Sequence, residues 1–223
     1  MKFIFQLVIL LSFGFHASAI TTYFEGHYNN VSPDTVTTES KTGTFSGLTF
    51  STNNNTLTHE DDSVFGFELG IDNLKIPNIR IGFSYLKPHI KLKSSTINGS
   101  VTNGSTTLSG AGIITPADWA SIGISFDNDI ELRMLNLYYD FDYNEKFKPF
   151  LGFGVGYADI QNTDGSELTT SFTGGAKYYL NETSYLGAKI NWASISGPTD
   201  KLFGIKYNDI DVFTSTLLIG FEF

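Results

Sequence analysis

The chain has 223 residues, of which 15% are aromatic and only 17% are charged, and its formal net charge is −9. It contains no cysteine, which excludes a disulfide framework and thiolate metal sites. Its length suits one domain with a sizeable core. Its acidity, without any basic run, argues against nucleic acid as a partner.

A secretory signal peptide is predicted at residues 1–19. Lys2 gives a positive start, Phe3–Phe15 forms a compact apolar stretch, and Ala17 and Ala19 supply the A-x-A pattern of a cleavage site. A retained membrane anchor is the alternative. The apolar stretch is, however, shorter than the roughly 20 residues that a membrane-spanning helix needs.

Eight later segments show the alternation of apolar with polar or small side chains that is typical of β-strands with two different faces. Each is roughly ten residues long, the length that a tilted strand needs to cross a bilayer. The predicted strands are Thr22–Asn29, Ser63–Asp72, Asn78–Lys87, Ile130–Asp142, Phe150–Ile160, Thr170–Leu180, Tyr185–Ala193 and Val212–Phe223.

The connections between these segments alternate in length. The long ones are Asn30–Asp62, Pro88–Asp129 and Ser194–Asp209, Gln161–Thr169 is intermediate, and the others are short. Long and short connections therefore fall at opposite ends of the strand set, as in a transmembrane barrel. Within the second long connection, Ile97–Gly110 is low-complexity polar sequence that we expect to be mobile. Thr115–Ile122 predicts a short helix with Thr115 as its N-cap.

The expected fold is an all-β, eight-stranded antiparallel up-and-down transmembrane barrel. An eight-stranded lumen is only just wide enough for side chains, so the Phe-, Tyr- and Leu-rich face would overfill it and should face lipid. Charged side chains on the other face should point inward and pair, because an unpaired buried charge is costly. The predicted interior network is Glu25, Glu68, Arg80, Asp140, Lys177, Lys189 and Glu222. A soluble barrel with the apolar face inside is the alternative fold.

Closure also accounts for the apolar end of the chain. Pairing the last strand with the first removes both sheet edges. Phe221 and Phe223 would then lie in an aromatic girdle at the interface on the side of the short turns.

Several of these segments resemble small outer-membrane β-barrels of the opacity-protein and surface-antigen type, which are similar to the membrane domain of the major outer-membrane A protein. The matching residues are NLYYDF (Asn136–Phe141), KPFLGFGVGYA (Lys148–Ala158), GGAKYYL (Gly174–Leu180) and the terminal Phe223. The resemblance covers the strands of most of residues 20–223 and leaves out the long loops.

The resemblance implies a bacterial outer-membrane location for residues 20–223, in contact with lipid and lipopolysaccharide. It also implies that the barrel-assembly machinery recognises the chain end at Phe221 and Phe223. The family includes adhesins, surface antigens and envelope-stabilising proteins. We therefore expect a non-enzymatic surface protein whose loops 30–62, 94–128 and 194–209 meet host molecules or neighbouring lipopolysaccharide.

Motifs for catalysis and cofactor binding are weak. The mature chain has three histidines, His27, His59 and His89, so a Ser-His-acid site would need neighbours from across the barrel. The acidic segment HEDD (His59–Asp62) is interpreted as a solvated loop end, with a cation or catalytic site as the alternative, and FDND (Phe126–Asp129) lacks the spacing of a calcium loop. We predict no catalytic residue, cofactor or metal.

Glycines 152, 154 and 156 alternate within a predicted strand and have no helix after them, unlike a nucleotide-binding loop. We expect them to make room for packing inside the barrel. Two functional alternatives to a surface protein stay open. One is a narrow channel lined by Glu68, Arg80, Lys177 and Lys189, and the other is a lipid-modifying enzyme that uses His27 and His59.

Overall fold

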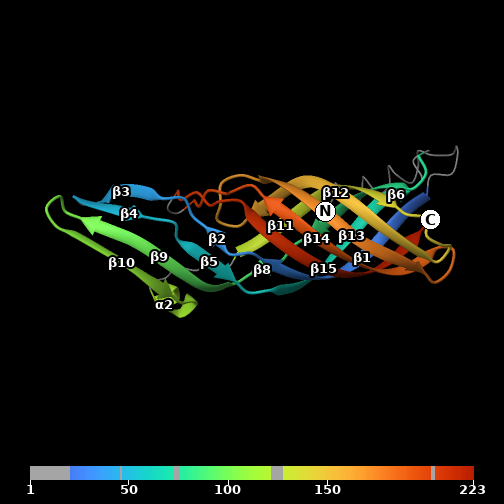
Figure 1. Cartoon of the computed structure of the whole chain (residues 1–223), viewed down its shortest axis with the longest axis horizontal. Helices are drawn as coiled ribbons and strands as arrows, with labels where there is room; N and C mark the ends of the chain where they lie inside the picture. The colour runs from blue at the N-terminus through green and yellow to red at the C-terminus, as the bar shows by residue number, and fades with distance from the viewer. Residues whose placement is uncertain (1–20, 46, 73–75, 122–127, 202–203) are drawn as a thin grey trace.

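The computed structural model describes residues 21–45, 47–72, 76–121, 128–201 and 204–223. Eight of its strands close into an antiparallel barrel in which each strand pairs with both neighbours, and β15 pairs with β1 (Figure 1). The predicted signal peptide lies outside the described residues. The barrel strands, in spatial order, are β1 (Thr21–Pro33), β6 (Asp62–Asp72), β7 (Ile79–Leu86), β11 (Asn128–Asp140), β12 (Phe147–Ile160), β13 (Glu167–Tyr179), β14 (Ser184–Ile195) and β15 (Ile210–Glu222).

Each barrel strand overlaps one predicted segment, and the predicted up-and-down barrel is confirmed. Strand β1 closes the sheet, because Glu25 lies opposite Gly220 on one side and opposite Glu68 on the other. The chain end is part of this closure: Thr22 and Phe223 exchange backbone hydrogen bonds of 3.2 and 2.8 Å. The backbone of the terminal strand is therefore paired within the barrel.

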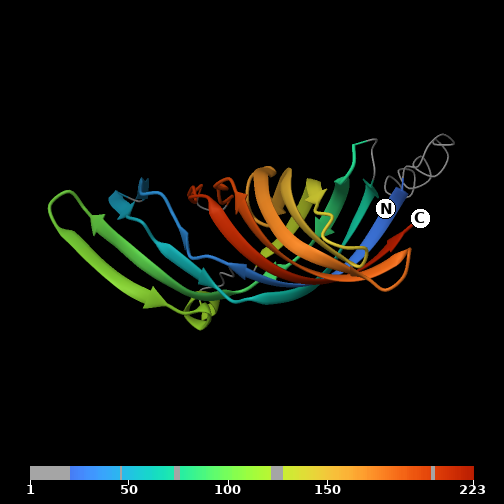
Figure 2. The ribbon, with the colours of Figure 1, turned by 45° about the vertical axis from the view of Figure 1, so that its right-hand side comes forward.

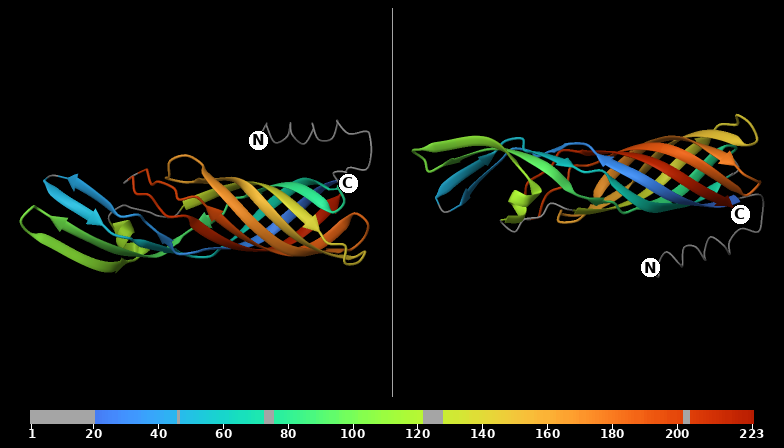
Figure 3. Two further views of the ribbon diagram at one scale, coloured as in Figure 1. Left: turned by 45° about the horizontal axis from the view of Figure 1, so that its top comes forward. Right: turned by 90° about the horizontal axis from the view of Figure 1, so that it is seen from below.

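The long connections lie at one end of the barrel, the loop end, and the short turns lie with the chain end at the other, the turn end (Figure 3). The described residues contain no helix that is both long and apolar enough to cross a bilayer.

The first two long connections form a second antiparallel sheet, which projects from the loop end (Figure 2). We call it the outer sheet. Its strands are β2 (Val36–Thr37), β3 (Lys41–Phe45), β4 (Leu48–Thr52), β5 (Thr56–His59), β9 (Leu92–Thr102) and β10 (Thr107–Ile114), while the short β8 (His89–Ile90) pairs with β11.

The expectation that Ile97–Gly110 is mobile was wrong, because this segment forms most of the β9–β10 hairpin. The turn explains the order. Gly104 has φ +91°, and the Asn103 side chain accepts hydrogen bonds from the backbone N–H groups of Ser105 and Thr106 at 3.1 and 2.8 Å. Asn-Gly is a strong hairpin signal when flanked by β-formers, and the composition of this segment hid that signal.

The predicted short helix is present as α2 (Pro116–Ser121). Thr115 Oγ1 accepts a hydrogen bond from the Asp118 backbone N–H at 3.3 Å. The Asp118 carboxylate in turn accepts hydrogen bonds from the Thr115 backbone N–H and hydroxyl at 2.9 and 2.6 Å. These reciprocal bonds form a capping box, in which an aspartate takes the place of the usual Glu or Gln.

Candidate functional site

The lumen holds the charged side chains that the strand alternation assigns to it. Among the seven predicted interior residues, five are almost fully buried, Lys189 is largely buried, and Glu222 is half-buried at the turn end. The five are Glu25, Glu68, Arg80, Asp140 and Lys177. We call these seven residues, with the side chains that contact them, the lumen network.

Arg80 on β7 occupies the centre of the lumen network. Its Nη1 lies 2.8 Å from Glu25 Oε1 and 3.8 Å from Glu68 Oε1, and its Nε lies 3.5 Å from Asp140 Oδ2. Its guanidinium carbon lies 4.2 Å from the ring centroid of Tyr138 and 4.8 Å from that of Tyr23. A planar guanidinium can pair with carboxylates at its edge and stack on aromatic faces at once.

Two lysines extend the network along the lumen. Lys177 Nζ donates to Asp140 Oδ2 at 2.8 Å, towards the turn end. Lys189 Nζ lies 3.4 Å from Glu68 Oε2 and 3.8 Å from Glu25 Oε2, towards the loop end. The three buried acids are thus balanced by three bases, which is the condition for keeping ionised groups in a narrow interior.

Four inward tyrosines also belong to the network, and the sequence analysis did not include them. Three donate to its central carboxylates: Tyr23 and Tyr138 donate to Glu68 at 2.6 and 2.8 Å, and Tyr185 donates to Glu25 at 2.8 Å. The fourth, Tyr179, donates to Glu222 Oε1 at 2.5 Å. The sequence contained the signal for them, because each tyrosine is an even number of residues from a predicted interior charge on the same strand and therefore lies on the same face.

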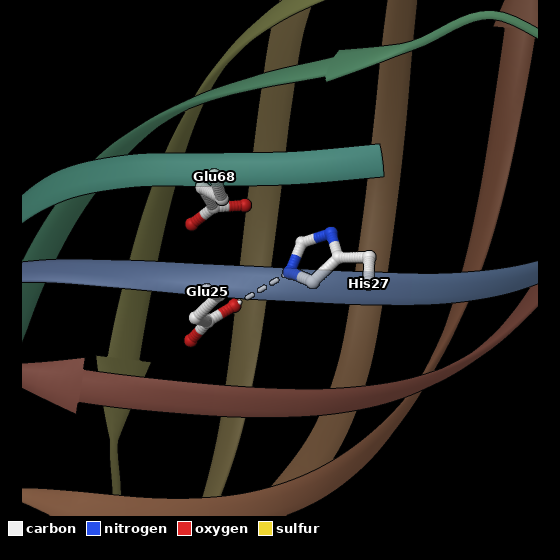
Figure 4. A group of neighbouring side chains, drawn as sticks. All are labelled: Glu25, His27 and Glu68. Carbon is white, nitrogen blue, oxygen red and sulfur yellow. Dashed lines mark hydrogen bonds and ion pairs between the residues drawn. The ribbon is translucent and has the colours of Figure 1, made fainter. Parts of the chain in front are cut away.

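His27 lies beside these carboxylates, and its Nε2 is 2.8 Å from Glu25 Oε2 (Figure 4). Ligand atoms of Glu25, His27 and Glu68 lie within 4.8 Å of one another, a spacing that could hold a metal ion. Arg80 and Lys189 already contact the same carboxylates, however, so a divalent cation would compete with two fixed positive charges. The arrangement is better suited to holding the barrel wall together than to binding metal.

A cavity of about 70 Å³ adjoins the network on its loop-end side and is lined in part by His27, Asn136 and Lys189. Its lining mixes polar and apolar side chains, and the polar ones and the size suit a few water molecules. Buried apolar side chains close the lumen above it: Val31, Ile90, Ile130, Leu132, Ala158, Ile160, Ile195 and Val212. The lumen is therefore filled by ion pairs at its middle and by an apolar cluster at its loop end.

The strand glycines have the packing role expected of them. A Cβ added at Gly152 would lie 2.3 Å from the Tyr138 ring, and one at Gly156 would lie 2.0 Å from the Arg133 carbonyl oxygen. Each therefore lies where the lumen has no room for a side chain. Their strand β12 is followed by β13, without the helix of a phosphate-binding loop.

The outer wall of the barrel is apolar and exposed. Side chains from four adjacent strands form a row of aromatics around it, since Phe153 lies opposite Phe172, Phe172 opposite Trp192, and Trp192 opposite Phe213. All four are about half exposed. Phe221 and Phe223 are exposed at the turn end. Such a wall marks an interaction surface, because soluble monomers rarely expose large contiguous apolar areas.

The histidines lie apart. His27 is in the lumen, and its hydrogen-bond partners are Glu25 and Lys189. His59 ends β5 at the base of the outer sheet, and burial lowers the pKa of its imidazole. His89 Nδ1 lies 2.7 Å from Asp129 Oδ1 at the barrel rim.

The rim also contains the two acidic segments. In HEDD, Asp62 accepts a hydrogen bond from the His89 backbone N–H at 2.8 Å. In FDND, Asp129 pairs with His89 and, at 3.1 Å, with Lys87. These acids are thus joined to neighbouring residues of the rim. Residues 126 and 127 of FDND lie outside the described residues.

The third long loop braces the first. Thr38 forms a β-bridge with Tyr207, and the Asn208 backbone N–H and side-chain amide donate to Thr37 at 2.9 and 2.6 Å. Burial raises the pKa of the Tyr207 phenol to about 12, so this phenol stays neutral. The loops proposed as contact surfaces are thus joined into one ordered structure within the described residues.

Comparison with solved structures supports the fold. The outer membrane protein AlkL, solved in lipid bilayers, matches with a TM-score of 0.50 and 16% identity over 94% of each chain. OprG from Pseudomonas aeruginosa matches with a TM-score of 0.48 and 18% identity. Neisserial surface protein A matches with a TM-score of 0.47 and 13% identity, and each match covers 92% of this chain and 96% of the other. No protein-family model and no curated protein matches the sequence. The likeness to AlkL confirms the resemblance to small outer-membrane barrels at the level of the fold.

Proposed function

We propose that this chain is a non-enzymatic surface protein of the bacterial outer membrane. In this proposal the barrel anchors the outer sheet, which faces the medium and contacts external macromolecules. The observation that carries the proposal is the inverted polarity of the barrel. Its ion pairs are inside, and its large apolar side chains, including Phe153, Phe172, Trp192 and Phe213, are outside.

This polarity fits lipid as the surrounding solvent. A bilayer requires every backbone polar group to be paired within the barrel and rewards an apolar outer face. Closure through β1 and β15 meets the first condition, and the exposed aromatic row meets the second. Phe221 and Phe223, which are exposed at the turn end, are the residues that the barrel-assembly machinery would recognise in this proposal.

The shape of the loop end favours surface contact as the function. Loops 30–62 and 94–128 supply the outer sheet, and loop 194–209 braces it, so the three present one large polar surface. Neighbouring lipopolysaccharide and host surface molecules are the partners that this surface would meet. No nucleic-acid role is proposed, because the chain is acidic.

The filled lumen argues against the narrow channel. Glu68, Arg80, Lys177 and Lys189 are paired across the lumen, where a channel would need them hydrated. We expect the protein in planar bilayers to give no steady conductance above the lipid baseline. Stable ohmic steps would favour the channel instead.

An enzymatic role lacks a catalytic arrangement among the described residues. His27 contacts a carboxylate and an ammonium group, and neither is the hydroxyl nucleophile of a hydrolase. His59 lies in a different sheet, away from the lumen. The test is a His27→Ala, His59→Ala double variant. Survival of a lipid-modifying activity in this variant would exclude an enzyme that uses either imidazole.

The test of orientation uses the absence of native cysteine. Ser105→Cys places a thiol at the exposed tip of the β9–β10 hairpin, and Glu145→Cys places one in an exposed turn at the other end. A membrane-impermeant maleimide should label the Ser105→Cys variant on intact cells, and should label the Glu145→Cys variant only after permeabilisation. The same protein should migrate faster unboiled than boiled on a denaturing gel. Labelling of both variants on intact cells, or recovery as a soluble protein, would overturn the proposal.

A further inference from the structure

Strand β10 is an unpaired edge of the outer sheet. It pairs with β9 through eight residues, from Thr107 opposite Thr102 to Ile114 opposite Ser95, and with no other strand among the described residues. Its side chains are exposed from Thr107 to Ile113. In an antiparallel pair, every second residue directs its N–H and C=O away from the partner strand. The outer side of β10 therefore presents backbone groups that an added strand can pair with.

This edge lacks the features that normally prevent strand addition. Protected edges carry charged side chains or proline, or are covered. Residues 94–115 contain neither an ionisable side chain nor proline. The opposite edge strand, β3, begins with Lys41, whose Nζ donates to the Gly204 carbonyl at 2.6 Å and ties that edge to the third long loop.

The β10 edge also exposes large apolar side chains. Leu108 is 73% exposed and Ile113 is 74% exposed, and they lie on opposite faces of the strand. Between them are Ser109, Gly110, Ala111 and Gly112. A long, flat, uncharged and partly apolar edge is the kind that templates pairing with another chain.

We propose that β10 pairs in antiparallel fashion with β10 of a second copy of this chain. A second copy suits the site because the strand is uncharged, so two copies meet there without repulsion although the whole chain carries −9. A charged peptide would gain no ion pair along this edge. A two-fold axis perpendicular to the sheet relates two such strands and keeps each face on the same side.

That symmetry requires each residue to face a residue on the same face of the second strand, so odd-numbered residues face odd-numbered ones and even-numbered residues face even-numbered ones. With the axis at Ala111, the two Ala111 residues face each other, Gly110 faces Gly112 of the second copy, and Leu108 faces Ile114 of the second copy. This register packs one large apolar pair on each side of a centre of small residues. It gives the backbone of the eight-residue strand a partner along most of its length.

The same symmetry places the two copies in facing membranes, an inference that rests on the proposed function. Strand β10 runs roughly along the long axis of the molecule, as the barrel does (Figures 1 and 3). An axis perpendicular to the strand and to its sheet then lies in the plane of the membrane. Rotation about it reverses the direction in which the second barrel points, so the contact joins two cells.

A single introduced cysteine tests this register. In Ala111→Cys, the two facing Cα atoms would lie about 4.5–5.5 Å apart, within the range of a disulfide. In the control Ser109→Cys, the equivalent residues are offset by four positions along the strands, or about 13 Å. Two cell populations that carry Ala111→Cys with different epitope tags are mixed and oxidised. We expect a disulfide dimer that contains both tags for Ala111→Cys, with at least tenfold less for Ser109→Cys.

Charge substitutions give a second readout. Cells that display the unchanged chain should clump through the β10 contact. Cells with Ala111→Lys or Ala111→Glu should each lose this clumping, because like charges then face each other, and mixing the two populations should restore it. Labelling of Ala111→Cys by impermeant maleimide without any mixed-tag dimer, or no effect of either charge, overturns strand pairing and leaves surface display intact. A dimer confined to one population overturns the facing-membrane arrangement. Absence of maleimide labelling on intact cells overturns the proposed function together with this inference.

Discussion

At the scale of single residues, Arg80 matters most because three carboxylates depend on it. Replacing Arg80 with Met keeps an apolar stem and leaves Glu25 and Glu68 with one fewer cation. Breaking a buried ion pair in this way costs about 3–5 kcal/mol. We expect the free energy of unfolding to fall by that amount, measured by urea titration in lipid vesicles with gel migration as the readout.

The matched control is Arg133→Met. Arg133 is about half exposed at the rim and pairs with Glu131 and Asp159. Exposed pairs contribute about 0–1 kcal/mol, so this variant should unfold close to the wild type. Equal losses in the two variants would contradict the central role of Arg80.

Gly156 offers a second test at this scale. A Cβ there would lie 2.0 Å from a backbone carbonyl oxygen, which cannot rotate away. Overpacking of this kind costs about 1–3 kcal/mol, so Gly156→Ala should lower the urea midpoint. At Gly174 the nearest atom would be the Leu151 side chain at 3.4 Å, so Gly174→Ala should be close to neutral. A neutral Gly156→Ala would show that β12 has more room than its packing indicates.

The sequence predicted which residues face the lumen but not how they pair. Strand parity assigns Glu25, Glu68 and Arg80 to the interior without any knowledge of register. That Glu25 lies directly opposite Glu68, with Arg80 reaching both, depends on the stagger between β1, β6 and β7. Stagger is a property of the closed barrel, and no single strand encodes it.

At the scale of elements, the barrel strands were predictable because each has one strongly apolar face. The outer sheet was not, since most of its strands are rich in Ser and Thr and none has a continuous apolar face. Composition alone indicated a mobile loop at Ile97–Gly110. The Asn103-Gly104 turn and the pairing of β9 with β4, β5 and β10 supply the order that composition hides.

The base of the outer sheet should weaken in mild acid. Burial lowers the pKa of His59, and its Nδ1 has no hydrogen-bond partner among the described residues. The opened segment binds the proton more readily, so stability is full above the unfolded pKa of about 6.5 and falls as pH drops through it. Proteolysis within residues 30–62 should therefore be faster at pH 5 than at pH 7.5.

The control for this prediction is His59→Gln, which cannot titrate in this range. The variant should show a smaller change in cleavage rate between the two pH values, with protease activity calibrated on a denatured substrate. A pH dependence of the same size in His59→Gln would assign the effect to other groups at the rim, such as His89 with Asp129.

At the scale of the whole molecule, the fold follows from where charge and apolar area are placed. Ion pairs and tyrosines fill the lumen, glycines give them space, and the bulky apolar side chains remain for the outer wall. Length, alternation and loop lengths were enough to predict this arrangement. The outer sheet, and with it the β10 edge, became visible only in the folded chain, because β9 pairs with β4 and β5, which are distant in sequence.

The most direct test of the account asks whether lipid touches the outer wall. The chain has two tryptophans, Trp119 and Trp192, and Trp192 lies 48% exposed in the aromatic row. In a Trp119→Phe variant, the fluorescence of Trp192 is measured in vesicles whose acyl chains carry bromine. The account predicts strong quenching compared with unbrominated vesicles of the same composition. Unchanged emission would mean that the Phe-rich face is buried in protein, and the barrel would then not be a membrane barrel.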